Sequence, residues 1–332
     1  MNNPKVTVVV PIYNVEKYVE KCLKSLISQT FNDIEILAIS DGSPDNSGNI
    51  VNMYKKKDKR IKYIEKENGG YGSVLEYAIK NTKTEYLLVC DPDDWLESNA
   101  IEILYENAKN NNLDITIGEK YLIYNDGEKK ISKNINPFYN IKSNYVYTGN
   151  EIEKISFCPQ SPHSKLFRTK CLKNIVFPYK VSYTDNNLFI LALKYSKRVM
   201  LIDKPLAYYL IERPGNTMTD KKPKAVMDRI VMWNYIFNQI NNNDEFIIYW
   251  LYKNFKYFSK VYYTNSNNFM HDDIFDELLK SRKRLLPYYK CIRKSFTKGI
   301  FAKIEIDLIM HSEATYKSYL KIRRILKKWN IF

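Results

Sequence analysis

Residues 87–95 read LLVCDPDDW, an uncharged apolar run that ends in the three carboxylates of Asp91, Asp93 and Asp94. A short apolar run stopped by a proline is typical of a buried strand. The acids would then lie at the carboxyl end of a central strand, which is the edge where open α/β sheets bind ligands. Three carboxylates this close repel one another, and Mg²⁺ or Mn²⁺ with oxygen ligands would offset that repulsion and hold phosphates. The alternative is a turn whose aspartates cap the next helix.

Composition limits the classes of protein to which the chain can belong. Its 332 residues, 45% of them hydrophobic, are enough for a sizeable core in one large domain or two. No apolar run approaches the ~20 residues that a membrane span needs, and the N-terminus lacks the pattern of a signal peptide. The five cysteines are odd in number and scattered, as expected of reduced thiols without a disulfide framework or a zinc site. We therefore expect a cytoplasmic location.

The positive charge is concentrated near the end of the chain. The net charge is +15, and residues 280–332 hold 15 Lys and Arg against 3 Asp and Glu. The rest of the chain is nearly neutral, so no nucleic-acid partner is expected. The basic segment is either a solvated helix, the more frequent case, or a helix that lies on an anionic membrane at the inner face.

The order of apolar segments predicts the fold. Strands are expected at residues 6–10, 34–39, 61–64, 87–90 and 114–118, and helices at 16–29, 50–57, 73–81 and 101–110. Strands and helices therefore alternate, which favours a mostly parallel sheet with helices on both faces. From residue 221 onward the pattern is helical and aromatic, so the class is α/β followed by an α-helical C-terminal region.

Polar residues follow three of the expected strands. Residues 11–14 (PIYN), 40–42 (SDG) and 91–94 (DPDD) each come directly after an apolar run. Because the carboxyl ends of parallel strands meet at one edge, these segments should converge there. An aromatic ring, an acid that accepts from a base N–H, and a metal-binding acid cluster together make a pocket for a nucleoside diphosphate.

These segments resemble the nucleotide-binding half of the family 2 glycosyltransferases with the GT-A fold. The resemblance rests on residues 8–47, on ENGGYG at 67–72 and on CDPDDW at 90–95. It is close over roughly residues 4–120 and looser as far as about 220. It implies transfer of a sugar from a nucleoside diphosphate sugar, usually UDP-linked, with inversion at the anomeric carbon. It also implies a nucleotide-sugar-binding half at residues 1–120, an acceptor-binding half at 121–220 and a separate helical region at 221–332.

The resemblance also implies a set of site residues. Pro11 and Tyr13 would line the uracil and ribose, and Asp41 would accept the uracil imide N–H. Asp93 would bind Mn²⁺ or Mg²⁺, with Asp91 on the metal, the ribose or the sugar. The full donor-binding set is Pro11, Tyr13, Asn14, Asp41, Gly70, Asp91, Asp94 and Arg213. The chain departs from many relatives at Ser40, where they have an acid, and at residues 75–76, where they have Arg-Asn.

Asp185 is the candidate catalytic base. It precedes an apolar helical pattern, so its simpler role is to cap that helix. The family places its base in an acidic segment at the start of such a helix, with an aromatic residue that Phe189 matches here. The resemblance implies that Arg213 lies in a loop that folds over the diphosphate in many relatives, where it could pair with phosphate; the alternative is an exposed surface residue. For His163, a structural hydrogen bond in a proline-rich turn is favoured over a functional role.

The expected acceptor is a hydroxyl of a glycan, lipid-linked or protein-linked molecule in bacterial surface polysaccharide or glycoconjugate synthesis. Two other classes of function remain open. A metal-dependent phosphoryl-transfer enzyme would need an aspartyl nucleophile after the first strand, where residues 11–13 offer none. A membrane-binding or nucleic-acid-binding module based on the basic tail would bind without metal-dependent turnover.

Overall fold

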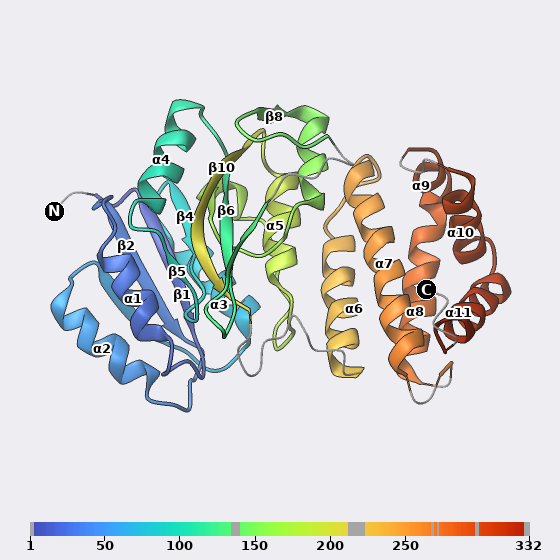
Figure 1. The fold of residues 1–332 in the computed structure, drawn as a ribbon, viewed down its shortest axis with the longest axis horizontal. Coiled ribbons are helices and arrows are strands. Elements are labelled where there is room, and N and C mark those ends of the chain that lie inside the picture. Colours follow the sequence, from blue (N-terminus) through green and yellow to red (C-terminus); the bar gives the residue numbers. More distant parts are fainter. Residues whose placement is uncertain are drawn as a thin grey trace. The chain divides into compact units, whose positions relative to one another are not determined.

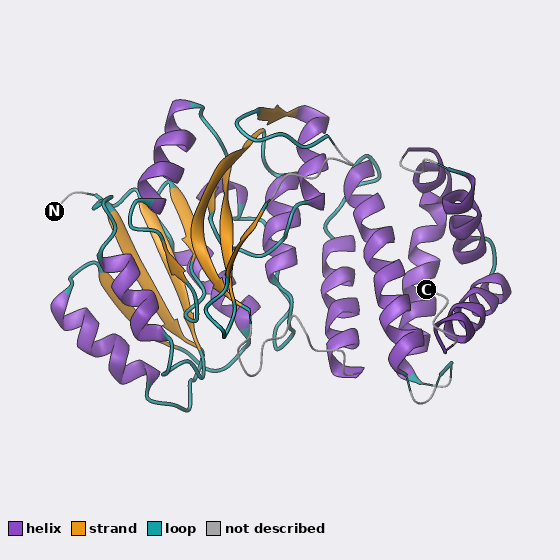
Figure 2. Ribbon diagram, in the orientation of Figure 1, coloured by secondary structure: helices purple, strands orange, loops and turns teal. Residues whose placement is uncertain are grey.

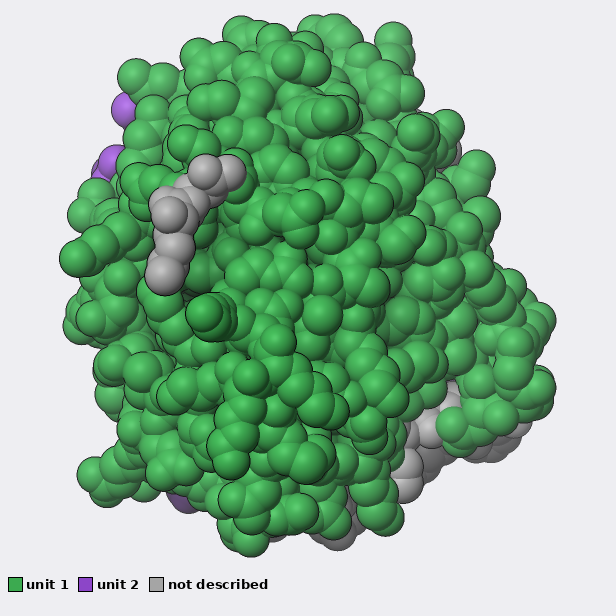
Figure 3. All heavy atoms as spheres, turned by 90° about the vertical axis from the view of Figure 1, so that its left-hand side faces the viewer, with its two compact units in different colours: residues 1–216 green, residues 217–332 purple. Residues whose placement is uncertain are grey.

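The computed structural model describes residues 3–133, 140–211, 223–266, 269–270, 272–295 and 299–328. The chain folds into two compact units, residues 1–216 and residues 217–332, which Figure 3 colours green and purple. The first unit is α/β and the second is helical (Figure 2). The boundary between them falls close to residue 221, where the sequence pattern changes to helical.

The first unit begins with the predicted alternation of strands and helices. Its early elements are β1 (Val6–Ile12), α1 (Val19–Ile27), β2 (Ile34–Ser40), α2 (Ser47–Lys57), β3 (Ile61–Glu65), α3 (Tyr71–Asn81), β4 (Tyr86–Val89), β5 (Trp95–Leu96), α4 (Ala100–Asn110) and β6 (Ile115–Ile123). Its later elements are β7 (Lys129–Ser132), β8 (Val146–Thr148), β9 (Lys165–Arg168), α5 (Asp185–Lys194) and β10 (Arg198–Leu210).

These strands form a single sheet that is mostly parallel (Figure 1). The strand order is β3-β2-β1-β4-β9-β6-β10-β5, with β7 on β6 and β8 on β10. The pairs β1–β2, β1–β4, β2–β3 and β6–β10 are parallel. Strand β9 lies antiparallel between β4 and β6. The predicted fold class is therefore confirmed.

Helices cover both faces because the central strands are apolar on both faces. All seven residues of β1 are buried. One core cluster joins Val6, Val8 and Val10 of β1 to apolar residues of α1, α2 and α4. Helix α3 contacts β1 and β2, but its buried Val74 and Leu75 are not part of that cluster. It therefore packs on the opposite face of the sheet.

Two features of the sheet differ from the sequence-based expectation. Strand β1 continues through Pro11 to Ile12, although the strand was expected to end at the proline. The β1–β4 pairing ends at Val9 and Val89, so Pro11 lies beyond the last rung on that side. Strand β10 is longer than expected and passes Pro205 at a shift in register. Prolines are tolerated at such irregular positions.

The second unit contains only helices among its described residues. They are α6 (Pro223–Phe237), α7 (Glu245–Asn265), α8 (Asp273–Leu285), α9 (Tyr289–Ser295), α10 (Ile300–Met310) and α11 (Glu313–Lys328). Trp233, Phe255, Tyr262 and Tyr316 are buried between them, so aromatic side chains form much of the core of this unit. In the described part of the chain, we find no helix with the length and apolar character to cross a membrane.

Candidate active site

The loops after β1 and β2 meet at one edge of the sheet, as the parallel order requires. Ile12 pairs with Ser40, and the Asp41 N–H donates to the Ile12 carbonyl at 2.9 Å. The Asn14 N–H donates to Ser43 Oγ at 2.8 Å, which ties the two loops together. Pro11 is buried in β1, whereas the Tyr13 side chain is 50% exposed at this edge. Tyr13 is therefore accessible to a ligand.

Asp41 holds the glycine loop at the same edge. Its carboxylate is buried and accepts from the Gly69 N–H at 3.0 Å, the Gly70 N–H at 2.7 Å and Lys66 Nζ at 2.5 Å. Gly70 has φ +82°, and a Cβ there would lie 2.8 Å from the backbone nitrogen of Lys180. Only glycine fits that position without strain. Contact of Asp41 with a nucleobase stays a prediction, as do the donor contacts of Gly70.

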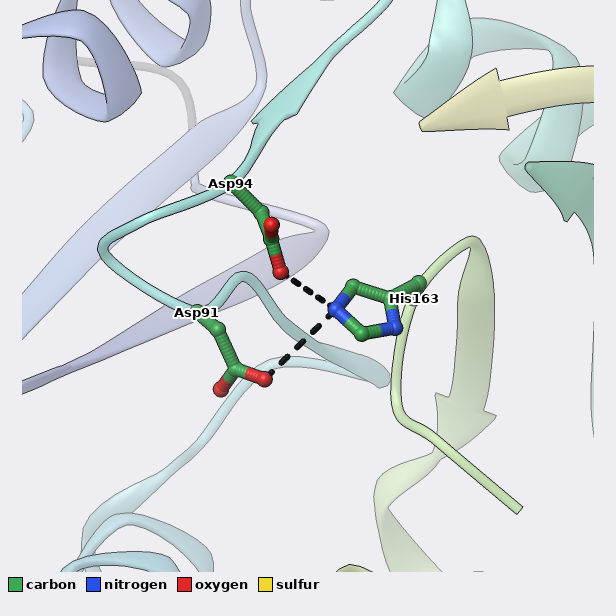
Figure 4. Close-up of side chains that lie close together, drawn as sticks. All are labelled: Asp91, Asp94 and His163. Atoms are coloured by element: carbon green, nitrogen blue, oxygen red, sulfur yellow. Dashed lines mark hydrogen bonds and ion pairs between the residues drawn. The ribbon is translucent and has the colours of Figure 1, made fainter. Parts of the chain in front are cut away.

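The acids after β4 gather around His163 (Figure 4). His163 Nε2 is hydrogen-bonded to Asp94 and lies 3.6 Å from Asp91 Oδ2. The second oxygen of Asp94 accepts from the Leu210 N–H at 2.9 Å, and Tyr71 donates to Asp91 at 2.7 Å. The acid loop is thereby tied to β10, to α3 and to the turn before β9.

The protonation of His163 follows from its neighbours. Burial and the adjacent Lys120 ammonium lower the pKa of His163 to about 3, so the ring is neutral. Lys120 Nζ lies 3.5 Å from Nδ1 and can only donate, so Nδ1 accepts and Nε2 carries the proton. Nε2 then donates to Asp94. In this tautomer the ring orients the carboxylate of Asp94, and the hydrogen bond predicted for His163 connects it to the acid cluster.

The cluster has the chemistry of a divalent-cation site. A carboxylate oxygen of Asp91, a carboxylate oxygen of Asp94 and a ring nitrogen of His163 lie within 4.8 Å of one another. With the proton on His163 Nε2, the two carboxylates are the groups that can bind a cation. Burial, together with the charges of Asp93 and Asp94, raises the pKa of Asp91 to about 7. A cation would relieve this crowding, and carboxylate oxygens suit Mg²⁺ or Mn²⁺. Asp93 is buried in the same loop, but it is not one of the three groups whose ligand atoms converge. Its role as a metal ligand stays a prediction.

Asp185 is the first residue of α5, so its position at the start of the helix is confirmed, and it is half-buried. The predicted capping role is wrong, because Thr184 is the N-cap residue. Burial raises its pKa, while Asn186 N–H and the nearby Lys165 and Lys120 oppose that rise. Burial and the charges of Asp91, Asp185 and Asp93 raise the pKa of the Tyr71 hydroxyl well above its usual value. The start of α5 and the acid loop after β4 therefore act electrostatically on the same side chain. Arg213, expected to reach the diphosphate, lies outside the described residues.

Two buried lysines beside the acids were not predicted from the sequence. The Lys120 and Lys165 side chains are 8% and 1% exposed, and both donate to Ser161, to its Oγ and its carbonyl respectively. Burial lowers the pKa of Lys120 to about 8 and that of Lys165 to about 7. Sequence offers little signal for them, since a lysine in a short strand usually faces solvent.

Comparison with known proteins identifies relatives of this chain. The model of glycosyl transferase family 2 matches residues 7–176. Glycosyltransferase GlyA of Streptococcus pneumoniae is 32% identical over 243 residues, which are 68% of this chain and 33% of that protein. The uncharacterized glycosyltransferase EpsJ of Bacillus subtilis is 31% identical over 70% of this chain and 68% of its own length. The poly(ribitol-phosphate) beta-glucosyltransferase of Bacillus spizizenii is 34% identical over 65% of this chain and 33% of that protein. The chain thus spans about a third of the length of GlyA and of the Bacillus spizizenii enzyme.

Solved structures share the fold. Residues 1–349 of Staphylococcus aureus TarS, in complex with UDP-GlcNAc, match with a TM-score of 0.68 at 19% identity, over 98% of this chain and 92% of that chain. The mannosyltransferase PcManGT of Pyrobaculum calidifontis, in complex with GDP-Man and Mn²⁺, matches with a TM-score of 0.52 at 13% identity, over 99% and 88%. With the family model covering half of the sequence and the fold agreeing throughout, the chain belongs to glycosyltransferase family 2 and has the GT-A fold.

Proposed function

We propose that this glycosyltransferase moves a sugar from a UDP-linked donor to an acceptor hydroxyl, with inversion at the anomeric carbon. The observation that carries the proposal is the convergence of Asp91, Asp94 and His163 at the edge of the sheet where β4 ends. An inverting transferase needs a cation-binding group on the donor side and a carboxylate on the acceptor side. Asp185 supports the second part, because it acts electrostatically on the Tyr71 hydroxyl that donates to Asp91. The UDP-GlcNAc bound by TarS supports the choice of UDP.

Asp91 and Asp94, with Asp93 beside them, are the residues that would hold Mn²⁺ or Mg²⁺. Bound there, the cation would neutralise the diphosphate and make it a better leaving group. His163 keeps one oxygen of Asp94 in place, and the Leu210 N–H keeps the other. Both oxygens of Asp94 therefore have a fixed partner, which supports the preorganised arrangement that electrostatic stabilisation requires.

Asp185 acts as the general base. Its carboxylate takes the proton of the acceptor hydroxyl while that oxygen forms a bond to C1 of the sugar, and the bond from C1 to the diphosphate oxygen breaks. Lys165 and Lys120 lower the pKa of Asp185 against the effect of burial, which favours its ionised form. A single displacement of this kind inverts the sugar and forms no covalent intermediate with the enzyme.

The proposed acceptor is a hydroxyl of a glycan, lipid-linked or protein-linked molecule made for the bacterial surface. The similarity to a poly(ribitol-phosphate) beta-glucosyltransferase supports this class of acceptor. The acceptor-binding half, residues 121–220, is where we expect it to bind. A cytoplasmic location, where nucleotide sugars are made, remains our expectation.

A panel of UDP-linked and GDP-linked sugars with Mn²⁺ or Mg²⁺, scored for release of nucleoside diphosphate, tests the proposal. We expect release with one UDP-sugar, its loss in excess EDTA, and a product of inverted anomeric configuration by NMR. Asp93→Asn should lose most of the activity while the protein stays folded. Full activity in excess EDTA would overturn the metal assignment, and a product with retained configuration would overturn the single displacement.

A further inference from the structure

Helix α10 exposes apolar side chains on the side opposite its packed face. Its buried residues are Ile306, Ile309 and Met310. The exposed ones, with their exposed fractions, are Ile300 (69%), Phe301 (84%), Ile304 (47%) and Leu308 (38%). At 3.6 residues per turn these four fall within an arc of about 100°, and the buried three lie across the helix from them. Single exposed apolar residues are ordinary, but a continuous apolar face marks an interaction surface.

The neighbouring helix α11 also exposes apolar side chains on the side away from its packed face. Helices α10 and α11 pack against each other (Figure 1). Ile322 and Ile325 of α11 are 53% and 55% exposed, although Tyr316 and Leu320 of the same helix are buried in the core. Exposed Lys321 and Lys327 lie one and two positions from these isoleucines in the sequence. Both helices therefore combine a packed side with an exposed apolar side, and α11 adds positive charge.

Residues 280–332 contain too few acidic residues to neutralise their own positive charge. Residues 280–332 hold 15 Lys and Arg and 3 acids. Each of those acids already has a basic partner: Glu305 pairs with Lys256, Asp307 with Arg293 at 2.8 Å, and Glu313 with Lys317 at 2.7 Å. Exposed lysines remain at positions 283, 290, 294, 321 and 327. An occupant of the surface should therefore be negatively charged as well as apolar.

We propose that the exposed face of α10 and α11 docks on an anionic phospholipid surface. The apolar side chains would enter the boundary between headgroups and acyl chains, and the lysines would contact the headgroups. At 11 residues α10 is too short to cross a bilayer, which leaves an orientation in the plane of the interface. A second copy of the chain would be a poorer occupant because it brings the same positive charge. This inference does not depend on the donor or the reaction proposed above.

Co-sedimentation of the full chain with vesicles tests the docking. Vesicles of phosphatidylcholine alone are compared with vesicles of phosphatidylcholine and phosphatidylglycerol at about 3:1. We expect strong binding only to the second kind. Because burying one large apolar side chain is worth a factor of about ten or more, Phe301→Ser with Ile304→Ser should weaken binding at least tenfold. Lys321→Glu with Lys327→Glu should weaken it as well, and should make the residual binding less sensitive to salt.

Met53→Ser is the matched control, since Met53 is an apolar helical residue that is 52% exposed in the first unit. It should bind vesicles as the parent does, and all variants should keep the parental melting temperature and nucleotide release. Equal binding to both kinds of vesicle, or unchanged binding of the Phe301/Ile304 variant, would overturn the proposal. So would a parental dimer in sedimentation velocity that dissociates in this variant, because the face would then be an interface between copies.

Discussion

Charged side chains are buried around the acid cluster of the first unit, whereas on α9 and α10 of the second unit they are partly exposed. Lys165 is 1% exposed and donates to a backbone carbonyl, whereas Arg293 and Asp307 form an ion pair at 42% and 36% exposure. A buried charge depends on each fixed partner, since water cannot replace one that is lost. An exposed charge is hydrated with or without its partner. Replacing a single charged residue should therefore cause a large loss of activity or stability in the first region and a small loss in the second.

The largest effect is expected at Asp185. Asp185→Asn keeps the size of the side chain and removes the proton acceptor, so transfer should fall by ~10²–10⁴. UDP affinity by calorimetry should change little, and the melting temperature should fall only slightly, because the favourable interaction of a charged carboxylate with the first turn of a helix is worth about 0.3–1 kcal/mol. Burial raises the pKa of Asp185, so parental transfer should decline on the acid side at a higher pH than a free carboxyl would give. A near-normal rate for the variant would leave Asp185 as a helix-terminal residue only.

The second largest effect is expected at His163, the residue that positions Asp94. His163→Phe keeps a ring but removes both the donor to Asp94 and the acceptor for Lys120. Loss of a partner that orients a metal ligand typically costs 10–100-fold, and the Mn²⁺ concentration for half-maximal activity should rise. His311→Phe, at an exposed histidine of the second unit, is the control and should match the parent. An unchanged Mn²⁺ dependence in the His163 variant would contradict its positioning role.

Because of Lys165, the stability of the protein should change with pH between about pH 7 and pH 10. Burial lowers its pKa to about 7, whereas the unfolded chain keeps the ordinary lysine value of about 10.4. Between these values the unfolded state binds more protons, so the free energy of unfolding rises with pH. Lys165→Met should flatten that rise in urea titrations at pH 7 to 10. Lys321→Met, at an exposed lysine, should keep it. Parallel pH profiles for the parent and the Lys165 variant would show that Lys165 stays charged in the fold.

The smallest effect is expected for the exposed pair in the second unit. Asp307→Asn removes the ion pair with Arg293, whose side chains are 36% and 42% exposed, and replaces a carboxylate that also accepts from the Tyr289 hydroxyl. The free energy of unfolding should hardly change, because exposed ion pairs contribute little. Urea denaturation of the parent and the variant measures the difference. A loss of unfolding free energy as large as that expected for a buried pair would mean that the packing of α9 and α10 depends on this contact. The two regions would then differ less than we expect.

Much of the site was predictable from local sequence patterns. The mostly apolar runs at 6–10, 34–39 and 87–90 determine three buried strands, because their apolar residues must avoid water; Glu35 is the charged exception and pairs with Lys62. Parallel pairing then forces the segments after them to one edge, which is where Asp41 and Asp91 lie. The start of α5 at Asp185 also follows from the helical spacing of the apolar residues after it. Ends of strands were less predictable, since β1 and β10 continue wherever a neighbour supplies hydrogen bonds.

Only the tertiary structure decided which partners complete the site. Hydrophobic periodicity describes how one element faces the core, and it carries no information on which strands become neighbours. Strand β9 enters between β4 and β6, and the turn before it brings His163 to Asp94 and Lys165 to the acid-rich edge. The sequence therefore determined the carboxylates and the strand ends that carry them. The order of strands in the sheet determined that His163 bonds Asp94 and that the buried Lys120 and Lys165 are bonded to Ser161. A buried charge is stable only beside such partners, and the tertiary structure supplies them.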